Sequence, residues 1–279
     1  MGLLHVDTAV RRDGERLVAD LSRDWEIWGP NGGYVSAIAL RAAGAQVPAG
    51  HRPASLSVQY LGVGGFGETE CRVTPVKQGR SAWLLNVEMI QAGKAFLQAQ
   101  VWTVARDDGP RVAEAAMPEA PPHEGLKTFG QHVRDHYGDS APDPHVFWRN
   151  IESKPIAWKP FDAPREARPA TLTQWYSFPG FDAGGDPFCD FTQACVLIDT
   201  LIWPTHHSTK AEAPDYIAPS LDLAIWFHEP PAGAEWLLMD VVADTARAGL
   251  IHGRSRLWTD DGRLVATGGS NMLHTPRRG

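Results

Sequence analysis

Asp199 is the residue of this chain that is best suited to acid–base chemistry. It lies inside the apolar run Val196-Leu197-Ile198-Asp199-Thr200-Leu201, for which we predict a helix. A carboxylate in such a run is partly desolvated unless partners stabilise its charge, and desolvation raises its pKa toward the range of a useful general base. The alternative is an acid that faces solvent, which is the usual place for a lone acid on a helix. Asp199 is therefore a candidate base whose surroundings decide between these readings.

Gly32 and Gly33 suggest a second piece of chemistry, the binding of a negatively charged oxygen. They follow Asn31, a suitable cap, at the start of a predicted helix over about 31–46. Amides in the first turn of a helix lack an internal partner and carry the positive end of the helix dipole. The Gly33 or Tyr34 amide can then hold an oxygen that gains negative charge, and small residues let a substrate approach closely. The alternative is that the glycines only permit close packing of the helix on a sheet.

The composition describes an ordinary globular chain. Its 279 residues are 43% apolar and 21% charged, which is enough for two domains of common size. A formal net charge of −7 argues against nucleic acid as a partner. The absence of a signal-like N-terminus and of an apolar stretch of transmembrane length predicts a cytoplasmic protein without a membrane partner. Cys71, Cys189 and Cys195 are odd in number and form no CxxC motif, which favours a reducing compartment and argues against a disulfide framework or a zinc knuckle.

The two halves of the sequence repeat one pattern. The run Pro53-Ala54-Ser55-Leu56 returns as Ala218-Pro219-Ser220-Leu221, and the Gly93-Lys94 turn has a counterpart in Gly262-Arg263. In each half a helical stretch precedes a series of strands separated by glycine-containing turns. Helices are predicted over 31–46 and 191–202, and strands over 54–61, 68–78, 81–91, 95–105, 171–177, 220–228, 236–246, 248–259 and 264–273. We therefore predict an α+β protein made of two fused copies of a small domain, each a helix wrapped by a curved antiparallel sheet, with a groove between the copies as the natural site.

The domain boundaries follow from where this pattern weakens. Proline interrupts the chain repeatedly between Arg106 and Pro169. We therefore predict an N-terminal repeat over 1–106, a proline-rich connection over 107–169 and a C-terminal repeat over 170–279.

Three motifs resemble those of type II acyl-CoA thioesterases. They are Trp28-Gly29-Pro30-Asn31-Gly32-Gly33-Tyr34-Val35, Ser220-Leu221-Asp222 with Trp226-Phe227-His228, and the terminal Leu264-Val265-Ala266-Thr267. The resemblance covers nearly the whole chain. It implies a double-hotdog fold of two tandem hotdog repeats, and hydrolysis of acyl-CoA to free acid and CoA. It implies no metal and no other cofactor.

The resemblance also implies a set of site residues. In the family a helix Asp of the second repeat, a Ser or Thr on the following strand and a Gln on the last strand hold the attacking water. Asp199 matches the first position and Ser220 the second. Where the family has Gln, the ungapped match is Ser270. Asn271 offers an amide if the register slips by one residue, which would turn its side chain to the other face of the sheet.

This departure at the third position leaves other functions open. The same groove could bind acyl-CoA without cleaving it, as a carrier or sensor. An enoyl-CoA hydratase is less well supported. The hydratase motif places Gly-Asp several residues before a His, but the spacing from Gly138-Asp139 to His145 is one residue too long, and these residues lie in the proline-rich connection. The sequence contains no Gly-x-Ser-x-Gly elbow of a serine hydrolase. We expect acyl-CoA as the small-molecule partner and a monomer or homo-oligomer, most readily a dimer, because exposed sheet edges can recruit a second copy.

Overall fold

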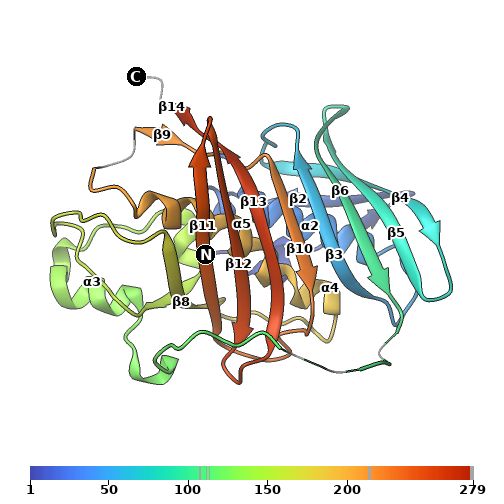
Figure 1. Ribbon diagram of the computed structural model, residues 1–279. Helices are drawn as coiled ribbons and strands as arrows, with labels where there is room; N and C mark the ends of the chain where they lie inside the picture. The colour runs from blue at the N-terminus through green and yellow to red at the C-terminus, as the bar shows by residue number, and fades with distance from the viewer. Residues whose placement is uncertain (107, 111, 113, 213–214, 277–279) are drawn as a thin grey trace.

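The computed structural model describes residues 1–106, 108–110, 112, 114–212 and 215–276 (Figure 1). The helices are α1 (Leu4–Asp7), α2 (Gly32–Gly44), α3 (Phe129–Tyr137), α4 (Pro187–Asp190) and α5 (Thr192–His207). Short 3-10 turns are η1 (Arg23–Trp25), η2 (His123–Gly125), η3 (Gly138–Ser140) and η4 (Val146–Asn150). The strands of the N-terminal half are β1 (Arg11–Asp13), β2 (Arg16–Leu21), β3 (Arg52–Tyr60), β4 (Gly67–Gln78), β5 (Ala82–Gln91) and β6 (Lys94–Val104). Those that follow are β7 (Glu152–Pro155), β8 (Thr171–Ser177), β9 (Tyr216–Ile217), β10 (Asp222–Phe227), β11 (Leu237–Arg247), β12 (Leu250–Thr259), β13 (Leu264–Leu273) and β14 (Thr275–Pro276).

Twelve of these strands form one sheet that runs through both halves of the chain. Its order is β1-β2-β4-β5-β6-β3-β10-β13-β12-β11-β8-β7, and β9 pairs separately with β14. The halves meet where β3 and β10 pair antiparallel, with Asp222 opposite Gln59 and Trp226 opposite Ser55. Each half therefore contributes its own meander, and the two meanders lie edge to edge as one continuous surface (Figure 1).

The long helices α2 and α5 lie together behind the sheet (Figure 1). Nearly every residue of both helices is buried, which explains why their sequences are apolar on all sides rather than along one stripe. At Gly33 the two backbones touch: a Cβ added there would lie 2.4 Å from the carbonyl oxygen of Cys195. The predicted α+β arrangement of one wrapped helix in each half is confirmed.

The connection between the halves contains more regular structure than the sequence pattern indicated. It includes α3, whose start carries a capping box between Thr128 and Gln131, and β7, which pairs with β8 at the edge of the sheet. The connection also covers the outer face of the C-terminal sheet, where the Trp175 indole donates to the carbonyl oxygen of Pro121 at 2.9 Å. Trp236 and Trp258 are buried in the same layer.

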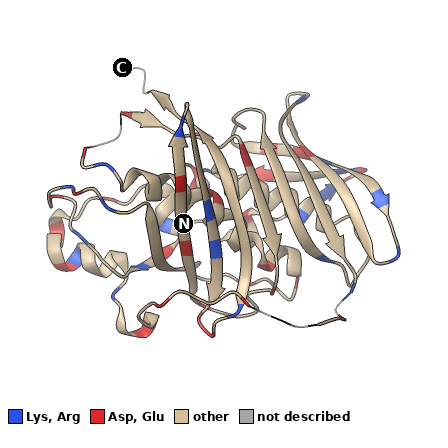
Figure 2. Cartoon of the chain, in the orientation of Figure 1, with Lys and Arg blue, Asp and Glu red and all other residues tan. Residues whose placement is uncertain are grey.

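The charged residues of this fold do not gather on one side. Figure 2 shows basic and acidic residues interspersed along the strands and loops. Among the residues that the structure describes, no helix combines the length and the apolar character needed to cross a membrane.

Candidate active site

Asp199 lies on α5 where the two halves of the protein meet. Its side chain is only 4% exposed. The Ser220 hydroxyl donates to its Oδ1 at 2.9 Å, and the Gly33 amide at the start of α2 donates to its Oδ2 at 2.8 Å. The next residue, Thr200, accepts a hydrogen bond from the Asn31 side chain at 3.1 Å, so α5 is tied to the first turn of α2. Asp199 is thus a buried acid on the inner side of the helix, not a solvent-facing one.

The surroundings of Asp199 change its proton affinity. Burial raises the pKa of this carboxyl above its ordinary value, and the hydrogen bonds from Ser220, the Gly33 amide and Tyr60 oppose that rise. Within the described part of the chain, no Lys, Arg or His lies within ion-pair distance of it. A buried carboxylate that is stabilised by neutral donors alone is a stronger base than an exposed aspartate.

Tyr60, the last residue of β3, is a member of this group that the sequence interpretation missed. Its hydroxyl lies 3.4 Å from Asp199 Oδ1 and 2.9 Å from the Ser36 hydroxyl of α2. Its backbone amide donates to the carbonyl oxygen of Leu221 at 3.0 Å, which fixes it beside Ser220. The sequence did carry a signal: Leu56 and Val58 are buried and alternate with exposed Ser57 and Gln59, so Tyr60 falls on the inner face.

The amides of Gly32, Gly33 and Tyr34, the three residues predicted to bind an oxyanion or substrate, have different partners. The Tyr34 amide donates to the Asn31 side chain at 2.9 Å, and the Tyr34 ring is buried against Trp25. The Gly33 amide is engaged by Asp199. The described residues provide the Gly32 amide with no hydrogen-bond acceptor, and Gly32 lines a cavity beside Asp199. Of the three, Gly32 is therefore the one free to bind an oxygen of a substrate.

The cavity has a volume of about 760 Å³. Its polar part includes Asp199, Ser220, Tyr60 and the backbone of Gly32, with Asn31, Thr200 and His145 nearby in the lining. The remaining wall is mainly apolar and draws on both halves and on the connection, through Trp28, Val63, Phe96, Trp148, Trp203 and Met272. A buried base at the wall of an apolar cavity suits a substrate with an apolar tail and a carbonyl group at its head.

Ser270 and Asn271 do not belong to the lining of this cavity. The Ser270 hydroxyl faces the interior but donates to the carbonyl oxygen of Asp222 at 2.7 Å. The Asn271 side chain donates to the Asp222 carboxylate at 2.8 Å and lies 3.2 Å from Nδ1 of His252. The structure therefore brings Asp199, Ser220, Gly32 and Gly33 together and places the two candidates for the third position beside Asp222.

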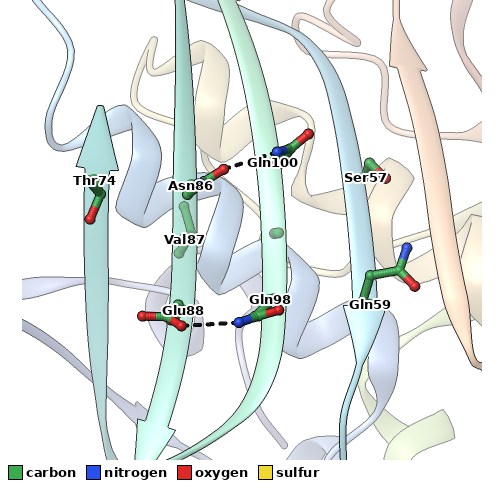
Figure 3. A pocket seen from close by; sticks show the side chains of 9 residues that line it. Ser57, Gln59, Thr74, Asn86, Val87, Glu88, Gln98 and Gln100 are labelled. Carbon is green, nitrogen blue, oxygen red and sulfur yellow. Dashed lines mark hydrogen bonds between the residues drawn. The ribbon is translucent and has the colours of Figure 1, made fainter. Parts of the chain in front are cut away.

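A second hollow, of about 460 Å³, lies on the outer face of β3 to β6 (Figure 3). Its side chains satisfy one another across neighbouring strands, with Gln100 donating to Asn86 and Gln98 donating to Glu88, each at 3.1 Å. Figure 3 shows these two pairs. Glu88, the carboxylate of this hollow, is partly exposed and Asp199 is buried, so the Asp199 cavity is the candidate active site.

Known proteins resemble this chain in sequence or in fold over most of its length. Acyl-coenzyme A thioesterase 8 of Mus musculus is 28% identical over 280 residues, covering 91% of this chain and 84% of that protein. A solved structure from Alicyclobacillus acidocaldarius, described as a conserved protein of unknown function with a hot dog fold, superposes with a TM-score of 0.80 at 21% identity over 99% of this chain and 98% of that one. An acyl-CoA thioesterase II of Mycobacterium marinum gives a TM-score of 0.77 at 20% identity over 98% of each chain. The predicted hotdog fold is confirmed.

Two family models divide the chain between them. One, described as the acyl-CoA thioesterase N-terminal domain, matches residues 21–104. The other, described as the acyl-CoA thioesterase C-terminal domain, matches residues 111–269. The chain therefore belongs to the acyl-CoA thioesterase family and is an acyl-CoA thioester hydrolase.

Proposed function

We propose that the protein cleaves acyl-CoA in the Asp199 cavity by direct attack of water on the thioester. One observation carries this proposal: a buried carboxylate, held by neutral donors from both halves, opens into an apolar cavity. Such a carboxylate can accept a proton from water, and the apolar wall can hold an acyl chain.

The proposed reaction has two steps. Asp199 accepts a proton from water while the water oxygen bonds to the thioester carbon, and the carbonyl π electrons move onto its oxygen. The tetrahedral intermediate then collapses: the carbon–oxygen double bond re-forms, the carbon–sulfur bond breaks, and the thiolate takes up the proton from Asp199. The products are the free acid and CoA, and Asp199 is again ionised.

The negative oxygen of the intermediate needs a donor. We assign this role to the Gly32 amide, which lines the cavity at the start of α2 and has no acceptor among the described residues. The helix dipole adds positive potential at this position. Donors of this kind typically contribute about 10²–10³ in rate.

Water is a better candidate for the nucleophile than a side chain. The hydroxyl of Ser220 donates to Asp199, so Ser220 helps to hold the carboxylate. Cys71, Cys189 and Cys195 are buried, and burial raises the pKa of each thiol, to about 12 for Cys71 and about 11 for Cys189. These thiols remain protonated at neutral pH, and none of them lines the cavity.

The first test is release of CoA from a panel of acyl-CoAs of increasing chain length, measured beside direct binding of the same compounds. We expect turnover with an optimum at the chain length that fills the apolar wall. Tight binding without turnover would favour a carrier or sensor. The absence of both binding and turnover would leave only the assignment of the fold supported.

The contact between Ser220 and Asp199 gives a second prediction. Ser220→Ala removes the hydrogen bond to Oδ1 and one of the three donors that lower the pKa of Asp199. We expect kcat to fall by about 10–10²-fold, since a hydrogen bond to a charged group is worth about 1.5–3 kcal/mol. We also expect the acid limb of the pH profile to move to higher pH, because the acid must lose its proton to act. A kcat within twofold of wild type would contradict this role, and Ser220→Thr, which keeps the hydroxyl, is the matched control.

We also infer a location in the cytoplasm, supported by three cysteines that form no disulfide in the described structure.

A monomer or a dimer, with the dimer favoured, remains our proposal for the assembly, since β1 and β7 are free edges of the sheet. Light scattering of the purified protein measures this directly.

A further inference from the structure

We propose that the hydroxyl of Tyr60 is the third group of the active site, supplying from β3 the donor that this chain lacks on β13. This inference rests on the proposed function, because it assigns a role in the attack of water assisted by Asp199.

Tyr60 shares one cavity with Ser220 and Asp199. The hydroxyls of Tyr60 and Ser220 both approach Oδ1 of Asp199, at 3.4 and 2.9 Å. At 3.4 Å the contact is longer than an ordinary O–H···O hydrogen bond. The Tyr60 hydroxyl is therefore available to bind a water molecule that also contacts Asp199.

The Tyr60 phenol acts as a hydrogen-bond donor. Burial and the charge of Asp199 raise the pKa of Tyr60 well above its ordinary value, so its phenol stays protonated and acts as a donor. The Ser36 hydroxyl, 2.9 Å away, can donate to the phenol oxygen and leave the phenol proton free to point at Asp199 or at water. Ser36 thus supports Tyr60 from α2.

Ser270 and Asn271, the two candidates on β13, already have other hydrogen-bond partners. Ser270 donates to the carbonyl oxygen of Asp222, and Asn271 is held by the Asp222 carboxylate on the other face of β13. Neither side chain lines the cavity. Tyr60 instead brings its hydroxyl to the carboxylate from β3 of the other half, the strand that pairs with β10.

Tyr60 has one phenol proton, which it can donate to Asp199 or to the water. A donor near Oδ1 stabilises the ionised carboxylate, so it keeps the base deprotonated at lower pH. A second donor near the water fixes its lone pair toward the thioester carbon, which raises the fraction of productive geometries. Other titratable groups near Asp199 are the Cys195 thiol on its own helix and His145, which lines the cavity.

The test is Tyr60→Phe, which removes only the hydroxyl. We expect kcat to fall by about tenfold with little change in KM, because one weak donor is lost while the cavity wall stays intact. We also expect the acid limb of kcat/KM against pH to move to higher pH. Ser36→Ala is a second variant, and its smaller loss should move the limb in the same direction.

Tyr176→Phe is the matched control. Tyr176 is buried on β8, and burial alone raises the pKa of its phenol, with no contribution from a carboxylate. Its kcat and acid limb should equal those of wild type. If the wild type is active and Tyr60→Phe keeps both its kcat and its acid limb, the role of Tyr60 is overturned and the proposed function stands. A wild type without turnover would overturn the proposed function, and the role of Tyr60 with it.

Discussion

Asp199→Asn is expected to lower kcat by about 10²–10⁴-fold and to leave the protein folded. The amide has no basic site, so water loses its proton acceptor. It keeps the shape of the acid: the Asn oxygen can accept from the Gly33 amide, and its nitrogen can donate to the Ser220 hydroxyl. The cavity should therefore remain, and binding of an acyl-CoA should change much less than turnover.

The same substitution has a predicted effect on stability, and its sign follows from the pKa of Asp199. The folded state raises this pKa above its unfolded value, so the charged form costs stability at neutral pH. This cost disappears as the pH falls and the carboxyl takes up its proton. We expect Asp199→Asn to melt at or above the wild-type temperature at pH 7, and the difference to close as the pH falls toward the pKa of a free aspartate.

Asp190→Asn is the matched control for this prediction. Asp190, at the end of α4 just before α5 begins, is also buried, and burial raises its pKa, but it accepts a hydrogen bond from the Ala232 amide at 3.0 Å. Its substitution should leave kcat near wild type. Loss of folding in Asp199→Asn, or an equal loss of activity in both variants, would mean that Asp199 has a structural role.

The elements of this fold were largely predictable because each half shows regular periodicity. Alternation of buried and exposed residues defines β3 and β10, and β8 and β13 end where the pattern places them. Helix α5 extends beyond its predicted end, through Pro204 to His207. Proline near the end of a helix removes one hydrogen bond, and the packing of a buried helix can offset that loss.

Local signals that depend on tertiary contacts were less reliable. Asp190 lies just before α5, where a side chain could cap the helix, but its carboxylate accepts a hydrogen bond from the Ala232 amide, and Phe191 precedes α5 without a side-chain cap. Helix α3 lies in the proline-rich connection and is mostly polar, but Phe129, Val133 and Tyr137 recur at helical spacing and Thr128 and Gln131 form a capping box. In each case a short-range pattern had more than one physical solution.

The candidate site shows the same division. Asp199 was visible because a carboxylate in an apolar helix demands partners, and the structure supplies them. Tyr60 was missed because its role depends on the pairing of β3 with β10, which joins residues far apart in the sequence. A single strand shows which face a tyrosine occupies, and the packing of the other half decides what it meets there.

Gly32→Ala is expected to lower kcat by about 10²-fold or more with a modest loss of stability. A Cβ at this position would lie 2.8 Å from Asp199 Oδ2 and 3.0 Å from the Tyr60 hydroxyl. Both are ends of side chains, which can rotate away at small cost to the fold. The rotation would move the base from its place and narrow the approach to the Gly32 amide.

Gly33→Ala should fail in a different way, although the two glycines are adjacent. Its Cβ would lie 2.4 Å from the carbonyl oxygen of Cys195 and 2.6 Å from the Cα of Val196, so α2 and α5 must separate. Overpacking of this kind costs about 1–3 kcal/mol or more, which corresponds to a fall of roughly 2–12 °C in Tm. Activity should fall as well, because separation of the helices breaks the contact between Gly33 and Asp199.

Comparing these two variants separates the chemistry of the site from the packing that supports it. Gly130→Ala in α3 is the control for the substitution itself, since its Cβ would meet only the ends of the Arg134 and Thr128 side chains, at 3.4 and 4.0 Å, and an alanine favours the helix. It should keep wild-type activity and melt at or above the wild-type temperature. If Gly32→Ala instead lost stability as severely as Gly33→Ala, or kept wild-type kcat, the carboxylate would not depend on the space at Gly32. The glycine pair is then explained by helix packing alone, and the oxygen of the intermediate must be held by another donor.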